Sequence, residues 1–183
     1  MSMDFITSLP PSNYNGKVYD AILVVVDALR KYTLYIPCRK DIDAPTLAQL
    51  VFRNVVPLMR NPKRLITDRG SLFTSNYWST LCYMIGTKRN LSTAFYPQTD
   101  GQTERQNQEL QYYLRAYVNF LQDDWVAWLP LAQMSHNRTM HSALGRAPCE
   151  ALMGWVPSFR IDVDEKPRIG KNPTAESRAR DIA

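Results

Sequence analysis

The sequence predicts an α/β fold in which a five-stranded mixed sheet is flanked by helices. Three apolar segments with short connections, residues 3–9, 21–27 and 32–38, are typical of antiparallel strands. After residue 37 the pattern alternates between strand-like and helical segments, which favours right-handed parallel crossovers beside the first three strands. The chain has 183 residues, 45% of them hydrophobic, so it can bury one substantial core.

Local signals predict the elements of the first hundred residues. Pro45 stands near the start of an amphipathic stretch, and Ser75 and Gly86 are suited to open and close a helix. Besides the first three strands, the expected elements are a turn over 11–16, helices over 45–59 and 75–86, and strands over 63–67 and 88–93. The last two strands complete the sheet.

A long helix is expected over residues 101–121. Its buried stripe is marked by apolar residues spaced by four, three and four: Leu110, Leu114, Tyr117 and Leu121. Shorter helices are expected over 123–137 and 147–155. From residue 157 the sequence becomes polar and rich in proline. We therefore expect residues 1–156 to form one domain and 157–183 to form a linker toward a C-terminal domain outside this chain, with 174–183 compatible with the start of a helix.

The composition argues against several classes of protein. The three cysteines are far apart and show no ligand spacing, which disfavours a structural zinc site and suits buried thiols in a reducing compartment. The longest apolar run, residues 21–26, is too short to span a membrane, and no signal peptide is evident. The sequence therefore predicts an intracellular, soluble protein.

The net charge of +5 is unevenly placed along the chain. Between residues 60 and 90 there are six basic residues and one acid, Asp68, so this segment alone carries the excess. Such a basic field suits an anionic partner such as a phosphate backbone, although solvated surface charges would give the same count.

Asp68 and Glu104 are the first candidates for a chemical role. Asp68 directly follows the strand 63–67, at a sheet edge where sites form. Glu104 lies at the start of the predicted long helix. A two-metal site needs further carboxylates, and Asp4 and Asp27 are available. Asp4 interrupts an apolar strand and has no cap or turn role, whereas Asp27 begins a turn in which Asp is common, so position favours Asp4.

Several segments together resemble the integrase catalytic core of gypsy-type LTR retrotransposons, a family related to retroviral integrases. They are "MDFITSLP", "AILVVVD", "LITDRGSLF", "STAFYPQTDGQTERQNQELQYYLRAYV" and "DDWVAWLPLAQMSHN". The resemblance covers about residues 2–158, and "TDRG" followed at this spacing by "PQTDGQTER" is more specific than either motif alone. The sequence departs from the family at Tyr96, where His is common, and at Gln133, where Glu is common.

The resemblance implies a ribonuclease-H-like fold and an Asp, Asp, Glu triad that maps onto Asp4, Asp68 and Glu104. It implies that this triad is catalytic, that it binds Mg²⁺ or Mn²⁺, and that 1–156 is an integrase catalytic core. The implied activity is a metal-dependent polynucleotidyl transferase that processes retrotransposon DNA ends and joins them to target DNA. The implied partners are DNA and further copies of the chain, with a core dimer among the implied assemblies, and no membrane. The implied location is the nucleus, with assembly in the cytoplasm.

Four basic residues are expected to contact DNA phosphates: Arg69, Lys88, Arg89 and Arg105. Asn107 and Gln108 are expected to face solvent in preference to touching DNA ends, and His136 to pack or to end a helix. Three other functions remain open: an inactive or domesticated core that binds DNA or protein, a ribonuclease H with Asp27 or Glu109 as a fourth carboxylate, and a two-carboxylate glycosidase, which the basic surroundings of Asp68 disfavour.

Overall fold

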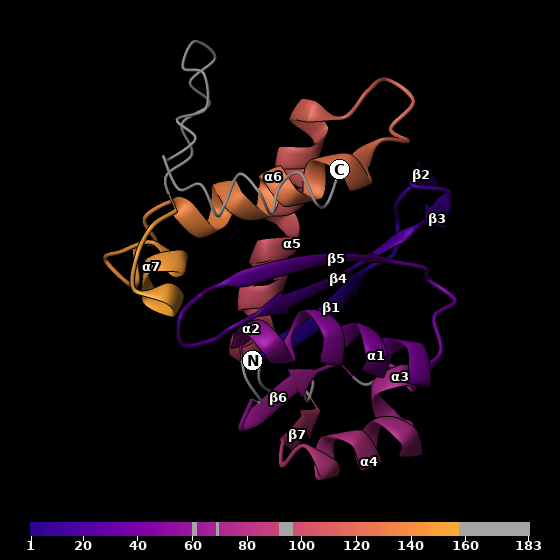
Figure 1. Ribbon diagram of the computed structural model, residues 1–183, viewed down its shortest axis with the longest axis vertical. Coiled ribbons are helices and arrows are strands. Elements are labelled where there is room, and N and C mark those ends of the chain that lie inside the picture. Colours follow the sequence, from indigo (N-terminus) through magenta and orange to yellow (C-terminus); the bar gives the residue numbers. More distant parts are fainter. Residues whose placement is uncertain (60–61, 69, 92–96, 158–183) are drawn as a thin grey trace, which may run out of the picture.

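A five-stranded mixed sheet forms the centre of the computed structural model, which describes residues 1–59, 62–68, 70–91 and 97–157 (Figure 1). Its strand order is β5-β4-β1-β6-β7. The strands are β1 (Ser2–Ile6), β4 (Ala21–Val26), β5 (Thr33–Cys38), β6 (Arg64–Thr67) and β7 (Lys88–Leu91). β4 pairs antiparallel with both β1 and β5, while β6 runs parallel to both β1 and β7. The predicted mixed sheet is therefore confirmed.

Helices cover both faces of this sheet. They are α1 (Ala44–Asn54), α2 (Val56–Met59), α3 (Ser71–Thr74), α4 (Asn76–Met84), α5 (Pro97–Tyr117), α6 (Trp125–Arg138) and α7 (Pro148–Met153). Side chains of α1 to α4 and α7 pack with one set of strand residues, and those of α5 and α6 pack with the alternate set. In Figure 1, α5 crosses the sheet on the side opposite α1. The alternation follows from the two-residue period of a strand.

Ser75 and Asp43 begin helices as their residue types favour. The Ser75 hydroxyl accepts a hydrogen bond from Trp78 N–H at the start of α4, and the Asp43 carboxylate accepts one from Thr46 N–H at the start of α1. Gly86, just beyond α4, has a φ of +70°, which suits a residue without Cβ. The predicted bounds of the helix over 75–86 are therefore close to those observed.

Two sequence predictions about local structure are wrong. Residues 11–16 do not form only a turn: β2 (Ser12–Tyr14) and β3 (Lys17–Tyr19) make a hairpin, joined by Asn15 and Gly16 with φ of 52° and 73°. Asn-Gly is a strong hairpin signal because both residues tolerate positive φ.

The long helix is also displaced from its predicted bounds. α5 begins at Pro97 and ends at Tyr117, so Leu121 lies beyond it and is 72% exposed. Of the predicted stripe, Leu110 and Leu114 are buried and Tyr117 is half exposed. Glu104 consequently lies about two turns inside the helix and not in its first turn.

The free edge of the sheet, β5, is covered by side-chain amides of α6. Asn137 accepts a hydrogen bond from Thr33 N–H and donates one to Thr33 C=O, each 2.8 Å long. The Gln133 side chain accepts from Tyr35 N–H at 3.0 Å, and Pro37 has no N–H to offer. Because an exposed edge strand invites pairing with other chains, this cover protects the sheet.

All three cysteines are buried and free, as their scattered positions suggest. Among the helices of the described residues, none has the length and apolar character needed to cross a membrane.

We expect Asn137→Ala to lower the free energy of unfolding by about 2–3 kcal/mol, because it leaves a buried N–H and C=O of Thr33 without partners. Denaturant unfolding measures this loss. The matched control is Asn13→Ala, at an exposed position of β2, which should change stability by less than about 0.5 kcal/mol. Equal effects at the two positions would contradict the proposed role of Asn137.

Candidate active site

Asp4 lies in the central strand β1 and points toward α5. Three alternate residues of β1 meet successive turns of that helix. Thr103 Oγ1 donates to Ser2 Oγ at 2.7 Å, Asn107 Nδ2 donates to Asp4 Oδ2 at 2.8 Å, and Ile6 shares a core cluster with Leu110. Asp4 Oδ1 also accepts a bond from Phe5 N–H at 2.8 Å. The half-buried carboxylate is thus fixed in orientation from two sides.

Asp68 follows directly after β6, on the strand next to β1. The parallel register pairs Ser2 with Ile66 and Met3 with Thr67. Asp4 and Asp68 are the next residues along these two segments. Paired residues of adjacent strands point to the same face and their backbones are about 4.8 Å apart. Topology therefore brings Asp68 beside Asp4, on the α5 face of the sheet.

The exposed Asp68 side chain folds back over the following turn. Its Oδ1 accepts a hydrogen bond from Gly70 N–H at 3.0 Å. A Cβ on Gly70 would lie only 3.1 Å from Asp68 Oδ1 and 3.3 Å from Oδ2. Glycine at position 70 therefore leaves room for the carboxylate to approach the backbone.

Glu104 lies on the open flank of α5. Thr103 and Asn107 face β1, and Gln106 reaches the other way, with its Oε1 accepting from Thr33 Oγ1 in β5 at 3.2 Å. At 100° per residue, Glu104 lies about 160° around the helix from Gln106, and hence on the β6 side. It is exposed. Glu104, Asp4 and Asp68 therefore border the same region.

The three carboxylates do not converge on one point in this structure. Within the described residues, no three His, Cys, Asp or Glu side chains are close enough together to hold a metal ion. Asp4 is held by Asn107 and Asp68 by the Gly70 N–H, so two of the three are oriented by their own neighbours. The three acids border one region without forming the tight cluster expected from the sequence.

Asn107 is a site residue that the sequence prediction missed. It does not face solvent: Nδ2 binds Asp4, and Oδ1 is buried with no hydrogen-bond partner among the described residues. An orphaned amide oxygen beside a carboxylate suits a cation or a bound water. With Asp4, Asp68 and Glu104 it makes a set of hard oxygen donors, which is the set that Mg²⁺ prefers. The sequence did contain a signal for this contact. Position 107 continues the helical spacing of the buried residues at 103, 110 and 114, which face the sheet.

Asp27 has the turn role that the sequence suggested. Its Oδ1 accepts from Leu29 N–H and Arg30 N–H, and Oδ2 pairs with Arg30 Nη1 at 2.9 Å. Burial raises the pKa of Asp27, but the bonds from Arg30 and Leu29 outweigh burial, so the pKa lies below 3.8. Val24 of β4 is the register partner of Asp4, and Asp27 lies three residues beyond it. Because β4 is antiparallel to β1, Asp27 is placed past the amino end of β1.

The basic residues expected to contact DNA are dispersed. Arg105 is exposed beside Glu104 and pairs weakly with Glu109 at 3.3 Å. Lys88 is exposed. Its partner in the β6–β7 register is Arg64, which lies four residues before Asp68. Arg89 is half buried and donates to Phe73 C=O and Ser79 Oγ, which joins β7 to α3 and α4. Arg69 lies outside the described residues.

His136 packs within α6, as expected from the sequence. Its Nδ1 lies 3.4 Å from Glu109 Oε2 and its Nε2 lies 3.4 Å from Lys31 C=O. Burial lowers the pKa of His136, despite the hydrogen bonds and the Glu109 charge that raise it. This pair lies on the flank of α5 that faces β5 and α6, away from Glu104.

The sequence is similar to retrotransposon polyproteins of Schizosaccharomyces pombe (strain 972 / ATCC 24843). The Transposon Tf2-3 polyprotein is 37% identical over 159 residues, which are 87% of this chain and 12% of the polyprotein. The Tf2-4 and Tf2-5 polyproteins give the same values. The chain therefore spans only a small part of these relatives. No family model matches the sequence.

Solved structures of viral integrase cores share the fold. The HTLV-2 integrase catalytic core domain in complex with magnesium, in its trimeric form, has a TM-score of 0.63 at 17% identity and covers 82% of this chain and 93% of that one. The catalytic core domain of BIV integrase has a TM-score of 0.60 at 22% identity and covers 84% and 92%. The predicted ribonuclease-H-like fold is thus confirmed.

We expect Asp27→Asn to lower stability at neutral pH by up to about 1 kcal/mol, because it removes the ion pair with Arg30. Since the folded-state pKa is lowered from 3.8, the contribution of Asp27 is present above pH 3.8 and is lost as the pH falls through the folded-state pKa. Denaturant unfolding at pH 7 and at about pH 3 should show a narrower gap between variant and wild type in acid. A gap that widens in acid would contradict this account.

Proposed function

Because the chain belongs to the integrase catalytic cores of LTR retrotransposons, we propose that it is a metal-dependent polynucleotidyl transferase that processes retrotransposon DNA ends and joins them to target DNA. The main support is the register of β1 and the parallel strand β6: Met3 pairs with Thr67, and Asp4 and Asp68 are the residues that follow this pair. Asn107, on the same helix as Glu104, holds Asp4 directly. Acids that are far apart in the sequence thereby border one region.

Asp4, Asp68 and Glu104 are the proposed ligands of Mg²⁺ or Mn²⁺ and the proposed catalytic residues. Their oxygens, with Asn107 Oδ1, fit such an ion, and the related HTLV-2 core is a complex with magnesium. When bound, the ion would neutralise charge on the phosphate and lower the pKa of the attacking water or hydroxyl group. The chain itself contributes orientation: Asn107 fixes the rotation of Asp4, and Gly70 N–H fixes that of Asp68.

DNA is the proposed substrate. We propose that four basic residues contact its phosphates: Arg69, Lys88, Arg89 and Arg105. Among the three of these that the structure describes, Arg105 has the best access, since it is exposed and next to Glu104. The structurally similar HTLV-2 core has been solved in a dimeric and a trimeric form, which supports a homo-oligomer. We further propose that residues 1–156 form the core and that residues 157–183 are a linker. A nuclear location is also part of the proposal.

A ribonuclease H activity has less support. It would need a fourth carboxylate near Asp4, and the two nominees are engaged elsewhere. Asp27 pairs with Arg30 just past the carboxyl end of β4, three residues beyond the partner of Asp4, and Glu109 accepts from Gln106 and Arg105 on the opposite flank of α5 from Glu104. An inactive binding module is the stronger alternative, because the three acids do not form a tight cluster among the described residues.

We expect Asp68→Asn to abolish metal-dependent strand transfer, a loss of at least about 10³-fold, since a charged ligand would be lost at an exposed position that the fold does not need. Activity is measured with Mg²⁺ or Mn²⁺ on strand-transfer and disintegration substrates, with far-UV circular dichroism as a check of folding.

The matched control is Asp27→Asn, which makes the same chemical change in a turn and should be far milder than Asp4→Asn. If Asp27→Asn were the more damaging of these two, Asp27 would replace Asp4 as the first ligand. Binding of DNA without turnover by the wild-type chain on either substrate would favour the binding module.

We expect Gly70→Ala to reduce strand transfer about tenfold or more with little loss of stability, because the new Cβ would displace the Asp68 carboxylate by a few tenths of an ångström. Gly145→Ala is a control of the same type at a loop glycine with nothing within 4 Å, although its φ of +64° makes it the more strained change. Full activity of Gly70→Ala would show that the position of Asp68 is not critical.

A further inference from the structure

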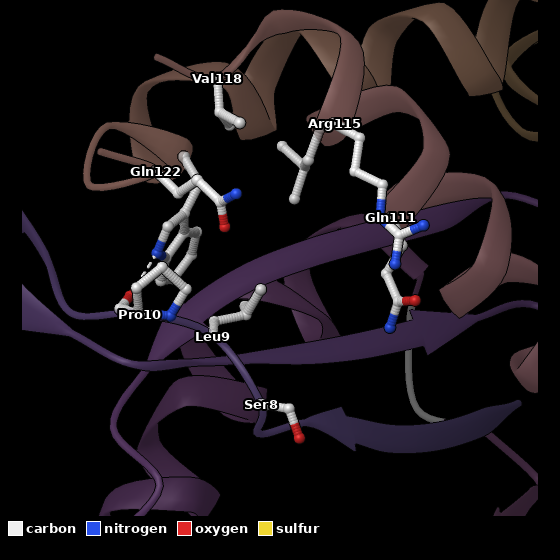
Figure 2. A pocket seen from close by; sticks show the side chains of 9 residues that line it. Ser8, Leu9, Pro10, Gln111, Arg115, Val118 and Gln122 are labelled. Atoms are coloured by element: carbon white, nitrogen blue, oxygen red, sulfur yellow. Dashed lines mark hydrogen bonds between the residues drawn. The ribbon is translucent and has the colours of Figure 1, made fainter. Parts of the chain in front are cut away.

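A cavity of about 250 Å³ lies beyond the carboxyl end of β1, between the last turns of α5 and the segment 8–10 (Figure 2). Figure 2 shows Arg115 and Gln111 on one side of it and Pro10 and Gln122 on the other. Trp125 also lines it, and its Nε1 donates to Pro10 C=O at 2.8 Å. This bond joins the start of α6 to segment 8–10.

The cavity opens on the same flank of α5 as Glu104. Residues 104, 108, 111 and 115 follow each other at intervals of four, three and four, so their side chains form one stripe along the helix. All four are exposed. The opposite flank is occupied by Gln106 and Glu109, which contact β5 and α6. The stripe therefore leads from the candidate catalytic acid to the cavity without crossing a packed surface.

The two ends of this stripe are about 16 Å apart. Eleven helical residues separate Glu104 from Arg115, at about 1.5 Å each. This separation matches about five nucleotides of a stacked DNA strand, at 3.4 Å per nucleotide.

The lining combines a cation and amides with apolar surface. Arg115 and Gln111 can donate to phosphate oxygens, while Leu9, Pro10 and Val118 offer apolar contact to a sugar or base. Among the described residues that line the cavity none is acidic, and Arg115 forms no ion pair with the described part of the chain. An anionic ligand with a flat, partly apolar body is the best chemical match.

We propose that this cavity binds one nucleotide of a DNA strand that runs along α5 from the active site, with Arg115 on its phosphate. The inference rests on the proposed function for the origin of that strand. The cavity is concave, so the nucleotide must leave the stack of a duplex, and the proposal therefore concerns a single-stranded extension.

The test is binding of fluorescent DNA duplexes that carry single-stranded extensions of zero to eight nucleotides, at fixed ionic strength. For the wild-type chain, affinity should rise when the extension reaches about five nucleotides. In Arg115→Gln this gain should fall about tenfold, and the slope of log Kd against log salt should decrease by about one. Arg146→Gln, the same charge change at an exposed loop position, should keep the gain.

The outcomes separate this inference from the proposed function. A gain that is absent, or that is equal in Arg115→Gln and wild type, would overturn the cavity as a nucleotide site even if the chain performs strand transfer. A gain that depends on Arg115 in a chain without metal-dependent activity would support the cavity while the catalytic proposal fails. Crosslinking of a photoreactive thymidine at about the fifth position to segment 8–10 would support the assignment, and crosslinking only to residues outside the lining would overturn it.

Discussion

The packing of α5 along β1 is the constraint on which the candidate site depends. Two residues of a strand advance about 6.6 Å and four residues of a helix about 6 Å, so alternate residues of β1 can meet successive turns of α5. Ser2 meets Thr103 and Asp4 meets Asn107 through hydrogen bonds. A shift of α5 by one turn would leave the Asp4 carboxylate without its amide donor, at a cost of about 1–3 kcal/mol. Polar pairs therefore fix a register that apolar contacts alone would leave loose.

Strand direction decides which acids can take part. β6 is parallel to β1 and its last residue, Thr67, pairs with Met3, so the residue that follows, Asp68, is placed beside Asp4. β4 is antiparallel to β1, so the residue after its end is placed beyond the other end of β1, and that residue is Asp27. Each acid directly follows a strand of the sheet. The topology separates the acid that lies beside Asp4 from the acid that forms a turn with Arg30.

The strands and most helices could be predicted because their signals are local. The apolar run of β4 and the Ser75 cap of α4 need no knowledge of the rest of the chain. Asn107 could not be assigned in this way, since an amide on a polar helix is usually solvated and its partner lies 103 residues away. The start of α5 was misplaced for a different reason. Residues 97–102 contain Pro, Asp and Gly, which favour turns, and the helix forms in spite of them.

The two flanks of α5 differ in their contacts: one packs against β5 and α6, and the other is exposed. On one flank, Gln106 accepts a hydrogen bond from Thr33 of β5 and donates one to Glu109, whose carboxylate lies 3.4 Å from His136 Nδ1 of α6. A neutral imidazole can donate to only one of its two neighbouring acceptors, and burial, which lowers the pKa of His136, favours that neutral form. This network and the β1 contacts hold the helix against rotation. Glu104 and Arg115, on the other flank, are exposed. Because the first flank supplies the rigidity, the second can keep its polar side chains available for a ligand.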